Sequence, residues 1–197
     1  MQIIFATGNP HKLLEAQEIL GPDFQLRTPA DYGITEDIPE TSDTIRGNAL
    51  QKARYIFQKT GLPCFSDDTG LEVDALGGAP GVHTARYAGE GKNFDDNVNK
   101  LLSELQHKAP FERRARFRCC VAFIAEDGSE TVFDGTVEGF ITEGRCGTRG
   151  FGYDPVFRPE GYDLTFSELS QEQKNAISHR GKAMRALAAY LKELIDF

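Results

Sequence analysis

The first twenty or so residues constrain the fold most, because they specify a strand, a tight turn and a helix in immediate succession. The apolar run 3–6 predicts a short buried strand. Asn9 fits the N-cap of a helix whose first position is Pro10. Apolar residues follow at helical spacing until Gly21 and Pro22 end the pattern. A strand that leads directly into a helix is typical of proteins in which helices pack on a sheet.

The rest of the chain continues to alternate extended and helical patterns. Further strands are predicted at 24–26, 63–66, 115–125 and 130–141, and further helices from a cap at Thr41 or Ser42 to Thr60, at 95–105 and at 179–195. Asp127 and Gly128 are typical of a hairpin turn. This order predicts an α/β fold with a mixed sheet and flanking helices. We expect one domain, residues 1–197, with two lobes around a central groove, where ligands often bind.

The charge balance limits the class of partner. The chain carries 30 acidic and 22 basic side chains, which give a formal net charge of -8. A surface this acidic repels polyphosphate strands, so we expect no nucleic-acid partner. A small anionic substrate is still compatible with this charge if a few basic side chains gather locally and a divalent cation screens the rest.

The cysteines and the N-terminus indicate a cytoplasmic protein. None of the four cysteines forms a C-x-x-C pair, and the adjacent Cys119 and Cys120 would point to opposite faces of a strand. This spacing favours buried, reduced thiols over a zinc site or a disulfide framework. The first apolar run has no basic segment before it and is too short for a signal peptide or a membrane span. We therefore expect no membrane partner.

The first candidate site is the loop between the N-terminal strand and helix, formed by Thr7, Gly8, Asn9, Pro10, His11 and Lys12. It matches neither G-x-x-x-x-G-K-[ST] nor G-x-G-x-x-G. Its chemistry is related, because Gly8 lets the backbone approach an anion, Thr7 and Asn9 can donate hydrogen bonds, and Lys12 adds charge beside a helix N-terminus. The alternative is an ordinary capped turn with a solvated lysine.

The second candidate site is acidic. Asp67, Asp68 and Thr69 follow an apolar stretch, and polar residues just past the carboxyl end of a strand usually face the ligand crevice of an α/β sheet. Two adjacent carboxylates can serve one hard cation, and Mg²⁺ typically takes one or two carboxylates together with phosphate oxygens. Glu40 is a plausible second ligand. The alternative is a turn in which the aspartates cap backbone groups.

Two further segments carry candidate ligand contacts. Phe151, Gly152, Tyr153 and Asp154 form a loop whose exposed aromatic rings could stack on a base, unless they only pack in the core. Lys174, His179 and Arg180 lie before and at the start of the last predicted helix. The histidine and arginine need not lie on its buried face, and basic groups are unfavourable beside a helix N-terminus, so they need another reason to be there. The alternative is a solvated helix end.

Other catalytic classes lack their signatures. The sequence contains no G-x-S-x-G, which argues against a serine nucleophile. Zinc chemistry is disfavoured because no H-x-x-x-H or H-E-x-x-H spacing occurs among His11, His83, His107 and His179.

Together these motifs resemble the inosine triphosphate pyrophosphatase family, in particular its bacterial dITP/XTP pyrophosphatase branch. The resemblance covers essentially the whole chain. It rests on ATGN at 6–9 with Lys12, SDDTGL at 66–71, LGGAPGV at 76–82 with ARY at 85–87, GFGYDP at 150–155 and KNAISHRG at 174–181.

The resemblance implies a Mg²⁺-dependent hydrolase, usually a homodimer, that cleaves non-standard purine nucleoside triphosphates (ITP, dITP, XTP) to the monophosphate and pyrophosphate. By the same resemblance, Thr7 to Lys12 form the phosphate loop, Glu40 and Asp68 bind the metal, and Asp68 is the general base. Substrate contacts carry over onto Thr69, Phe151, Gly152, Tyr153, Asp154, Lys174, His179 and Arg180, with Lys52 as a secondary phosphate contact.

The base preference has a physical reason. Inosine and xanthine present an acceptor oxygen at C6 to the donors of His179 or Arg180, whereas adenine presents a donor there. An unpaired buried donor costs about 1–3 kcal/mol.

Two rival functions stay open: a nucleotide sensor without turnover, which would not need Asp68 as a base, and a related pyrophosphatase acting on methylated pyrimidine triphosphates.

Overall fold

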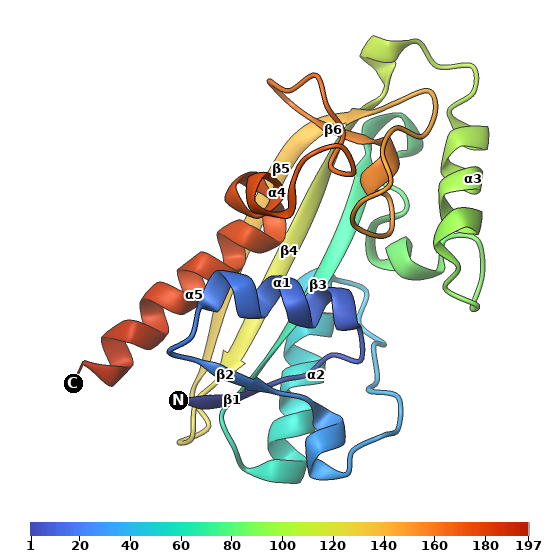
Figure 1. Ribbon diagram of the computed structural model, residues 1–197. Coiled ribbons are helices and arrows are strands. Elements are labelled where there is room, and N and C mark those ends of the chain that lie inside the picture. Colours follow the sequence, from blue (N-terminus) through green and yellow to red (C-terminus); the bar gives the residue numbers. More distant parts are fainter. Residues whose placement is uncertain (197) are drawn as a thin grey trace. The chain divides into compact units, whose positions relative to one another are not determined.

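The computed structural model describes residues 1–196 (Figure 1). Its strands are β1 (Gln2–Phe5), β2 (Gln25–Arg27), β3 (Cys64–Val73), β4 (Arg114–Ile124), β5 (Glu130–Ile141) and β6 (Phe157–Pro159). Its α-helices are α1 (Pro10–Leu20), α2 (Ile45–Thr60), α3 (Phe94–Glu104), α4 (Gln171–Ile177) and α5 (His179–Ile195), with short 3-10 turns in the connections. Within residues 1–196, no helix is both long and apolar enough to cross a membrane.

The strands form one mixed sheet in the order β2-β1-β3-β4-β5-β6. β1 runs parallel to β2, with Ile3 beside Leu26, and parallel to β3, with Phe5 beside Phe65. β5 and β6 are antiparallel, with Phe140 beside Arg158. The predicted α/β class with a mixed sheet and flanking helices is therefore confirmed.

The chain divides into two compact units. The first comprises Met1–Asp68, Cys119–Gly135 and the chain from Arg180, and the second comprises Thr69–Arg118 and Thr136–His179. Each has its own hydrophobic core. A single functional domain with a groove between two lobes stays a prediction.

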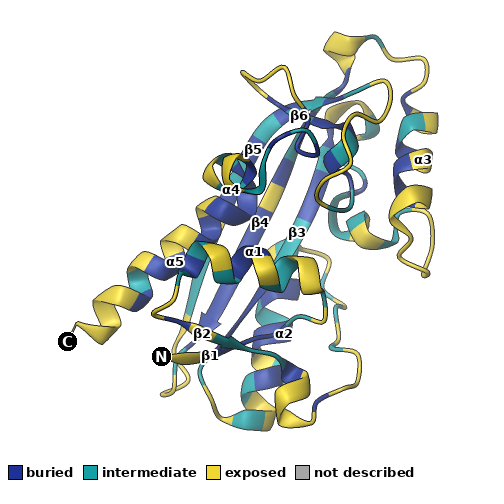
Figure 2. Cartoon of the chain, viewed as in Figure 1, coloured by how far each residue is buried: buried dark blue, intermediate teal, exposed yellow. Residues whose placement is uncertain are grey.

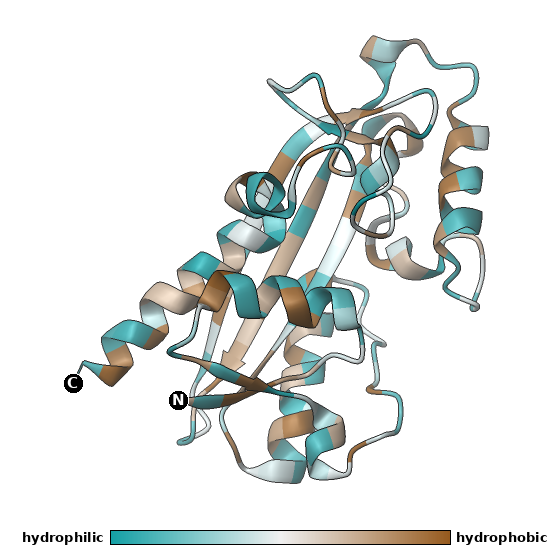
Figure 3. Ribbon diagram, viewed as in Figure 1, coloured by the Kyte–Doolittle hydropathy of each residue, from teal (hydrophilic) through white to brown (hydrophobic). Residues whose placement is uncertain are grey.

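In the first unit, helices cover both faces of the sheet. Ile3, Phe5 and Phe65 pack against α1 and α5, and the Phe5 and Phe65 rings stack with centroids 4.5 Å apart. The opposite face packs against α2, and its buried residues include Ile4, Ala6, Ala49, Ala53, Ile56, Cys64, Ala122 and Ile124. Buried positions follow the strands and the inner faces of these helices (Figure 2), as do the apolar residues (Figure 3).

The adjacent cysteines test the strand assignment directly. Cys119 belongs to the core on the α1 and α5 side, and Cys120 to the core on the α2 side, so their predicted opposite orientation is confirmed. Cys64 is also buried, but Cys146 is exposed. The expectation of four buried thiols is wrong for Cys146, because it lies in the irregular segment before β6 rather than in a strand.

The second unit packs its core on one face of the sheet. Residues of β3, β4 and β5 meet α3 there; they include Leu71, Val73, Val98, Leu101, Phe117, Val137 and Ile141. The other face carries an ion-pair ladder. Arg116 Nε donates to Glu138 Oε1 at 3.0 Å and its NH1 to Asp74 Oδ1 at 2.9 Å, and Arg118 Nε donates to Glu72 Oε2 at 2.7 Å.

The start of α2 differs from the prediction. Its N-cap is Thr44, whose side chain accepts from the Gly47 N–H at 2.9 Å. Thr41 and Ser42 are not caps, because their backbone N–H groups donate to Gln51 Oε1 and Asn48 Oδ1, both at 2.8 Å. The helix ends at Thr60, as predicted.

Candidate active site

The loop after β1 is held in place by its own polar groups. The Asn9 side chain accepts from the N–H groups of His11 and Lys12 at 2.9 and 3.4 Å, and Pro10 occupies the first turn of α1. The Asn9 N–H donates to Thr7 Oγ1 at 3.0 Å. The predicted N-cap is confirmed. Gly8 has open space where a Cβ would stand, so the backbone there can be approached closely.

The sequence predicted that Asp67 and Asp68 follow the end of a strand. This is wrong, because both lie inside β3, which continues to Val73. Consecutive strand residues point to opposite faces of a sheet. Asp67 accordingly contacts Lys12, whose helix α1 packs on one face, and Asp68 contacts Lys52, whose helix α2 packs on the other. The two carboxylates therefore form their direct ion pairs with different lysines.

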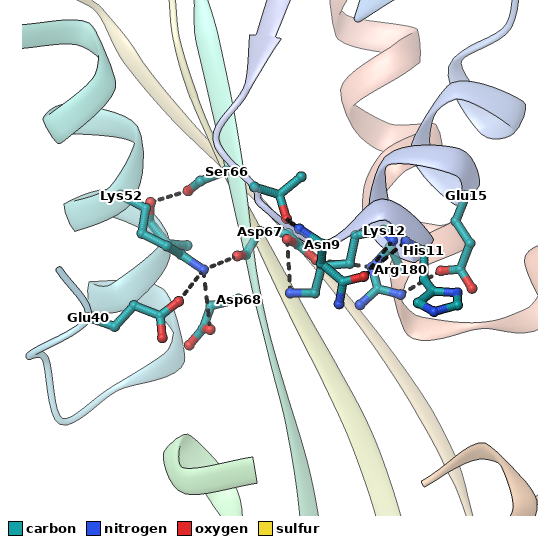
Figure 4. A network of polar contacts seen from close by, with 12 residues as sticks. Asn9, His11, Lys12, Glu15, Glu40, Lys52, Ser66, Asp67, Asp68 and Arg180 are labelled. Atoms are coloured by element: carbon teal, nitrogen blue, oxygen red, sulfur yellow. Dashed lines mark hydrogen bonds and ion pairs between the residues drawn. The ribbon is translucent and has the colours of Figure 1, made fainter. Parts of the chain in front are cut away.

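Asp67 is the centre of a buried charge cluster (Figure 4). Its side chain is 1% exposed, and its two oxygens accept from Lys12 Nζ at 3.2 Å and Arg180 Nε at 3.0 Å. Arg180 NH1 also donates to Glu15 Oε2 at 2.5 Å. Burial alone would raise the pKa of Asp67, but the charges of Lys12, Arg180 and Lys52 outweigh it and hold that pKa below its ordinary range. Asp67 is thus an anion throughout the neutral range.

Lys52 of α2 holds the other carboxylates (Figure 4). Its Nζ lies 2.6 Å from the Asp67 carbonyl oxygen, 2.9 Å from Glu40 Oε1 and 3.6 Å from Asp68 Oδ1. Burial lowers the pKa of Lys52, but the surrounding carboxylates outweigh that effect and raise it. Burial raises the pKa of Asp68, and the charges of Lys52 and Lys12 offset only part of this shift.

Glu40 and Asp68 are the carboxylates available to a cation. Both contact the one ammonium of Lys52, so both reach the same small region. Across residues 1–196, no group of three or more His, Cys, Asp or Glu side chains gathers as a metal cage. Two carboxylates without a third protein ligand suit Mg²⁺, which usually completes its shell with phosphate oxygens and water. The residues present therefore fit a cation held jointly with a polyphosphate.

The predicted aromatic loop lies in the second unit. Phe151 is half-buried, but Tyr153 is buried and donates its hydroxyl to the Thr84 carbonyl at 2.7 Å. For Tyr153 the alternative of core packing therefore holds, whereas the Phe151 ring stays partly accessible. Asp154 is buried and accepts from Lys174 Nζ at 2.7 Å, and that ammonium lies 4.9 Å from the centre of the Phe151 ring.

Both residues at the start of α5 are buried. The His179 ring stacks on Phe117 with centroids 4.6 Å apart and 12° between planes, while Arg180 belongs to the Asp67 cluster. A solvated helix end is therefore excluded. Thr69 follows Asp68 in β3 and is half-buried. The phosphate and metal candidates thus lie in the first unit with Arg180, and the aromatic loop, Thr69, Lys174 and His179 lie in the second.

Sequence reasoning missed Glu15. It lies one helical turn after Lys12, is buried, and binds Arg180 from 165 positions away in the chain. The available signal was a carboxylate beside the apolar stripe of α1, next to Ala16. Its partner could not be read from sequence spacing.

The comparisons with known proteins decide the family. A family model described as the Ham1 family matches residues 3–190. This chain belongs to the Ham1 family. A dITP/XTP pyrophosphatase of Porphyromonas gingivalis is 52% identical over 96% of this chain and 97% of its own length. A dITP/XTP pyrophosphatase of Flavobacterium johnsoniae is 51% identical over 95% of this chain and 96% of its own length. The Staphylococcus aureus Ham1 protein has the same fold, with a TM-score of 0.88 and 38% identity over 98% of this chain and 99% of that chain.

These findings confirm the family predicted from the motifs. The matched Ham1 region, 3–190, includes every segment that carried the resemblance. The curated relatives also align over nearly their full lengths, so this Ham1-family chain spans what its relatives span.

Proposed function

We propose that this chain hydrolyses the non-standard purine nucleoside triphosphates ITP, dITP and XTP to the monophosphate and pyrophosphate, so that deaminated purines leave the nucleotide pool. One observation carries the proposal: about half of its residues are identical, along nearly its whole length, to proteins named dITP/XTP pyrophosphatase. The cluster of Lys12, Lys52, Glu40, Asp67 and Asp68 supports it, because it sets cations that can bind phosphate beside carboxylates that can bind a metal.

The first unit is assigned the triphosphate. The N-terminus of α1, with Thr7, Gly8 and Asn9 before it, offers backbone N–H groups and the positive end of a helix dipole to an anion. Lys12 and Lys52 add two cations that stabilise charge developing on the pyrophosphate leaving group. Asp67 keeps Lys12 directed inward.

Glu40 and Asp68 are assigned the metal. Mg²⁺, when bound, would neutralise phosphate charge that develops during displacement. Asp68 would also orient or deprotonate the attacking water. Its raised pKa suits a base, because a carboxylate whose pKa lies closer to neutrality accepts a proton more readily. Lys52 holds both carboxylates in reach of one region before the metal arrives.

We assign recognition of the purine base to the second unit. Phe151 offers a half-buried ring for stacking, beside an ammonium and a carboxylate that lie 2.7 Å apart, those of Lys174 and Asp154. His179 is stacked and fixed in orientation by Phe117. For Arg180 we keep a substrate contact as a prediction and add a second role: two of its N–H groups hold Asp67 and Glu15, which fixes the cluster that directs Lys12.

Product identity tests this proposal. Purified protein with ITP and Mg²⁺ should yield IMP and pyrophosphate in a ³¹P NMR spectrum, and a chelator should abolish the reaction. IDP and orthophosphate would contradict the proposal, because the wrong bond would have broken.

We also propose a homodimer, which light scattering tests: the mass should be twice the 21.8 kDa of one chain.

A further inference from the structure

A second aromatic side chain lies beside Phe151. Phe94 is the first residue of α3, and 42% of it is exposed to solvent. Its ring centroid lies 6.0 Å from that of Phe151, with 41° between the ring planes. Phe94 does not belong to the buried core cluster of the second unit, to which α3 contributes Val98 and Leu101. A large ring held half in water beside another ring is therefore not explained by core packing.

The two rings are held near each other by a strap between their segments. Arg145 lies in the irregular loop that leads to Phe151, and its NH2 donates to the Asp95 carbonyl at 3.1 Å and to Asn99 Oδ1 at 2.9 Å. Asp95 directly follows Phe94 in α3. The loop that carries one ring is thus bonded to the helix that carries the other.

The surroundings of Phe151 favour a flat ligand with a polar edge. Lys174 Nζ lies 4.9 Å from the centre of the ring and is itself held by Asp154. The ring thus has a cation over it and a second aromatic ring beside it. A heterocycle that stacks here gains dispersion contacts from the rings and has a polar pair within reach of its edge.

We infer that Phe94 and Phe151 together hold the purine base of the nucleotide, with Phe94 as a second stacking surface. This inference rests on the proposed function and adds a residue to it. Two rings that enclose a base lie about 7 Å apart, because each stacked contact takes about 3.5 Å. The two ring centroids are 6.0 Å apart here, so the rings must move slightly apart to admit a base. Phe94 can supply it by a side-chain rotation, since nearly half of it is unconstrained by packing.

Phe94 would set affinity rather than base choice. Stacking tolerates any base, because every base has a π-face, and it grows with ring area. Phe94 should therefore strengthen binding of ITP, XTP and ATP alike. Uniform binding of this kind lowers KM and leaves kcat unchanged.

The test compares Phe94→Ala and Phe94→Leu with the wild type in ITP and XTP hydrolysis. Both variants should raise KM about fivefold to tenfold, the lower end of the loss expected for one stacking surface, with kcat within about twofold. Phe94→Tyr should restore the wild-type KM. Leucine keeps the apolar bulk and lacks the ring, so it separates stacking from packing. Phe111→Leu is the matched control, because Phe111 is 81% exposed in the same unit.

The outcomes separate this inference from the function on which it rests. If the wild type releases pyrophosphate from ITP and the Phe94→Leu variant keeps its KM, Phe94 does not contact the base and only this inference fails. If Phe111→Leu raises KM as much as Phe94→Leu, the effect is not specific and the inference also fails. If the wild type hydrolyses neither ITP nor XTP, the proposed function fails and the inference falls with it.

Discussion

Two neighbouring aspartates take different environments because strand geometry separates them. Asp67 faces α1 and α5, where two cations hold its oxygens, and Asp68 faces α2, where one lysine reaches it at 3.6 Å. The first carboxylate has a lowered pKa and the second a raised one. A fixed anion suits the positioning of cations, and a carboxylate with a raised pKa suits proton transfer.

Asp68→Asn should lose most turnover while the protein stays folded and binds nucleotide. The amide keeps the size of the side chain but cannot accept the proton of the attacking water. Single-turnover rates and ITP binding, measured separately, check this. A variant that hydrolyses ITP at close to the wild-type rate would remove Asp68 from the role of base.

Asp67→Asn should destabilise the protein by about 3–5 kcal/mol at pH 7, because Lys12 and Arg180 lose a buried partner. The pKa of Asp67 is depressed in the folded state, so its contribution is present above the unfolded value of about 3.9 and is lost as pH falls below it. Urea unfolding of the wild type and the variant should show a difference in unfolding free energy that is constant from pH 7 to about 5. This difference should shrink below about pH 4. The exposed Asp163→Asn serves as control. A difference independent of pH would contradict the ion pairs.

Thiol labelling tests the burial of the cysteines. Cys146 is exposed, and Cys64, Cys119 and Cys120 are buried. Burial raises the pKa of Cys64 and of Cys120 to about 12, so neither forms thiolate near pH 8. Iodoacetamide at pH 8 should label the native protein at Cys146 alone, and the Cys146→Ser variant should label only after unfolding. Rapid modification of Cys64 in the native protein would contradict the structure.

At the scale of elements, local signals predicted most boundaries well. The Asn9 cap, the strand 130–141 and the helix 179–195 are confirmed. β3 was predicted too short, because Asp-Asp-Thr-Gly is typical of a turn. Here Lys12 and Lys52 satisfy the two carboxylates, so the strand continues through them. Tertiary contacts from distant elements overrode local propensity, and a single sequence does not contain those contacts in readable form.

The ladder on β4 yields a prediction for the sheet of the second unit. The Arg116 side chain is 18% exposed and bonds Glu138 and Asp74, whereas the Arg118 side chain is 49% exposed and bonds Glu72. Arg116→Met should cost about 1–2 kcal/mol of unfolding free energy and Arg118→Met less than about 1, since exposed pairs contribute little. Denaturant titration at low and high salt checks this. Equal costs, or costs unchanged by 1 M salt, would contradict a charge network.

At the scale of the molecule, the sequence predicted which residues matter better than which of them meet. The expectation from composition that nucleic acid is not a partner stays a prediction, and joint motifs identified the family. The pairing of Glu15 with Arg180 and the burial of His179 depend on the assembled core, and neither follows from spacing. The residues assigned to phosphate and metal fall in one unit, and those assigned to the base fall in the other, with Arg180 as the exception.

The most direct test of the central claim is kcat/KM with Mg²⁺ for ITP, dITP, XTP, dGTP and ATP, with pyrophosphate and orthophosphate assayed separately. ITP, dITP and XTP should release pyrophosphate about tenfold to a hundredfold more efficiently than ATP, because adenine leaves a buried donor unpaired. dGTP should also be a poor substrate. Equal efficiency with ATP, or orthophosphate as the product, would contradict a pyrophosphatase that selects non-standard purines.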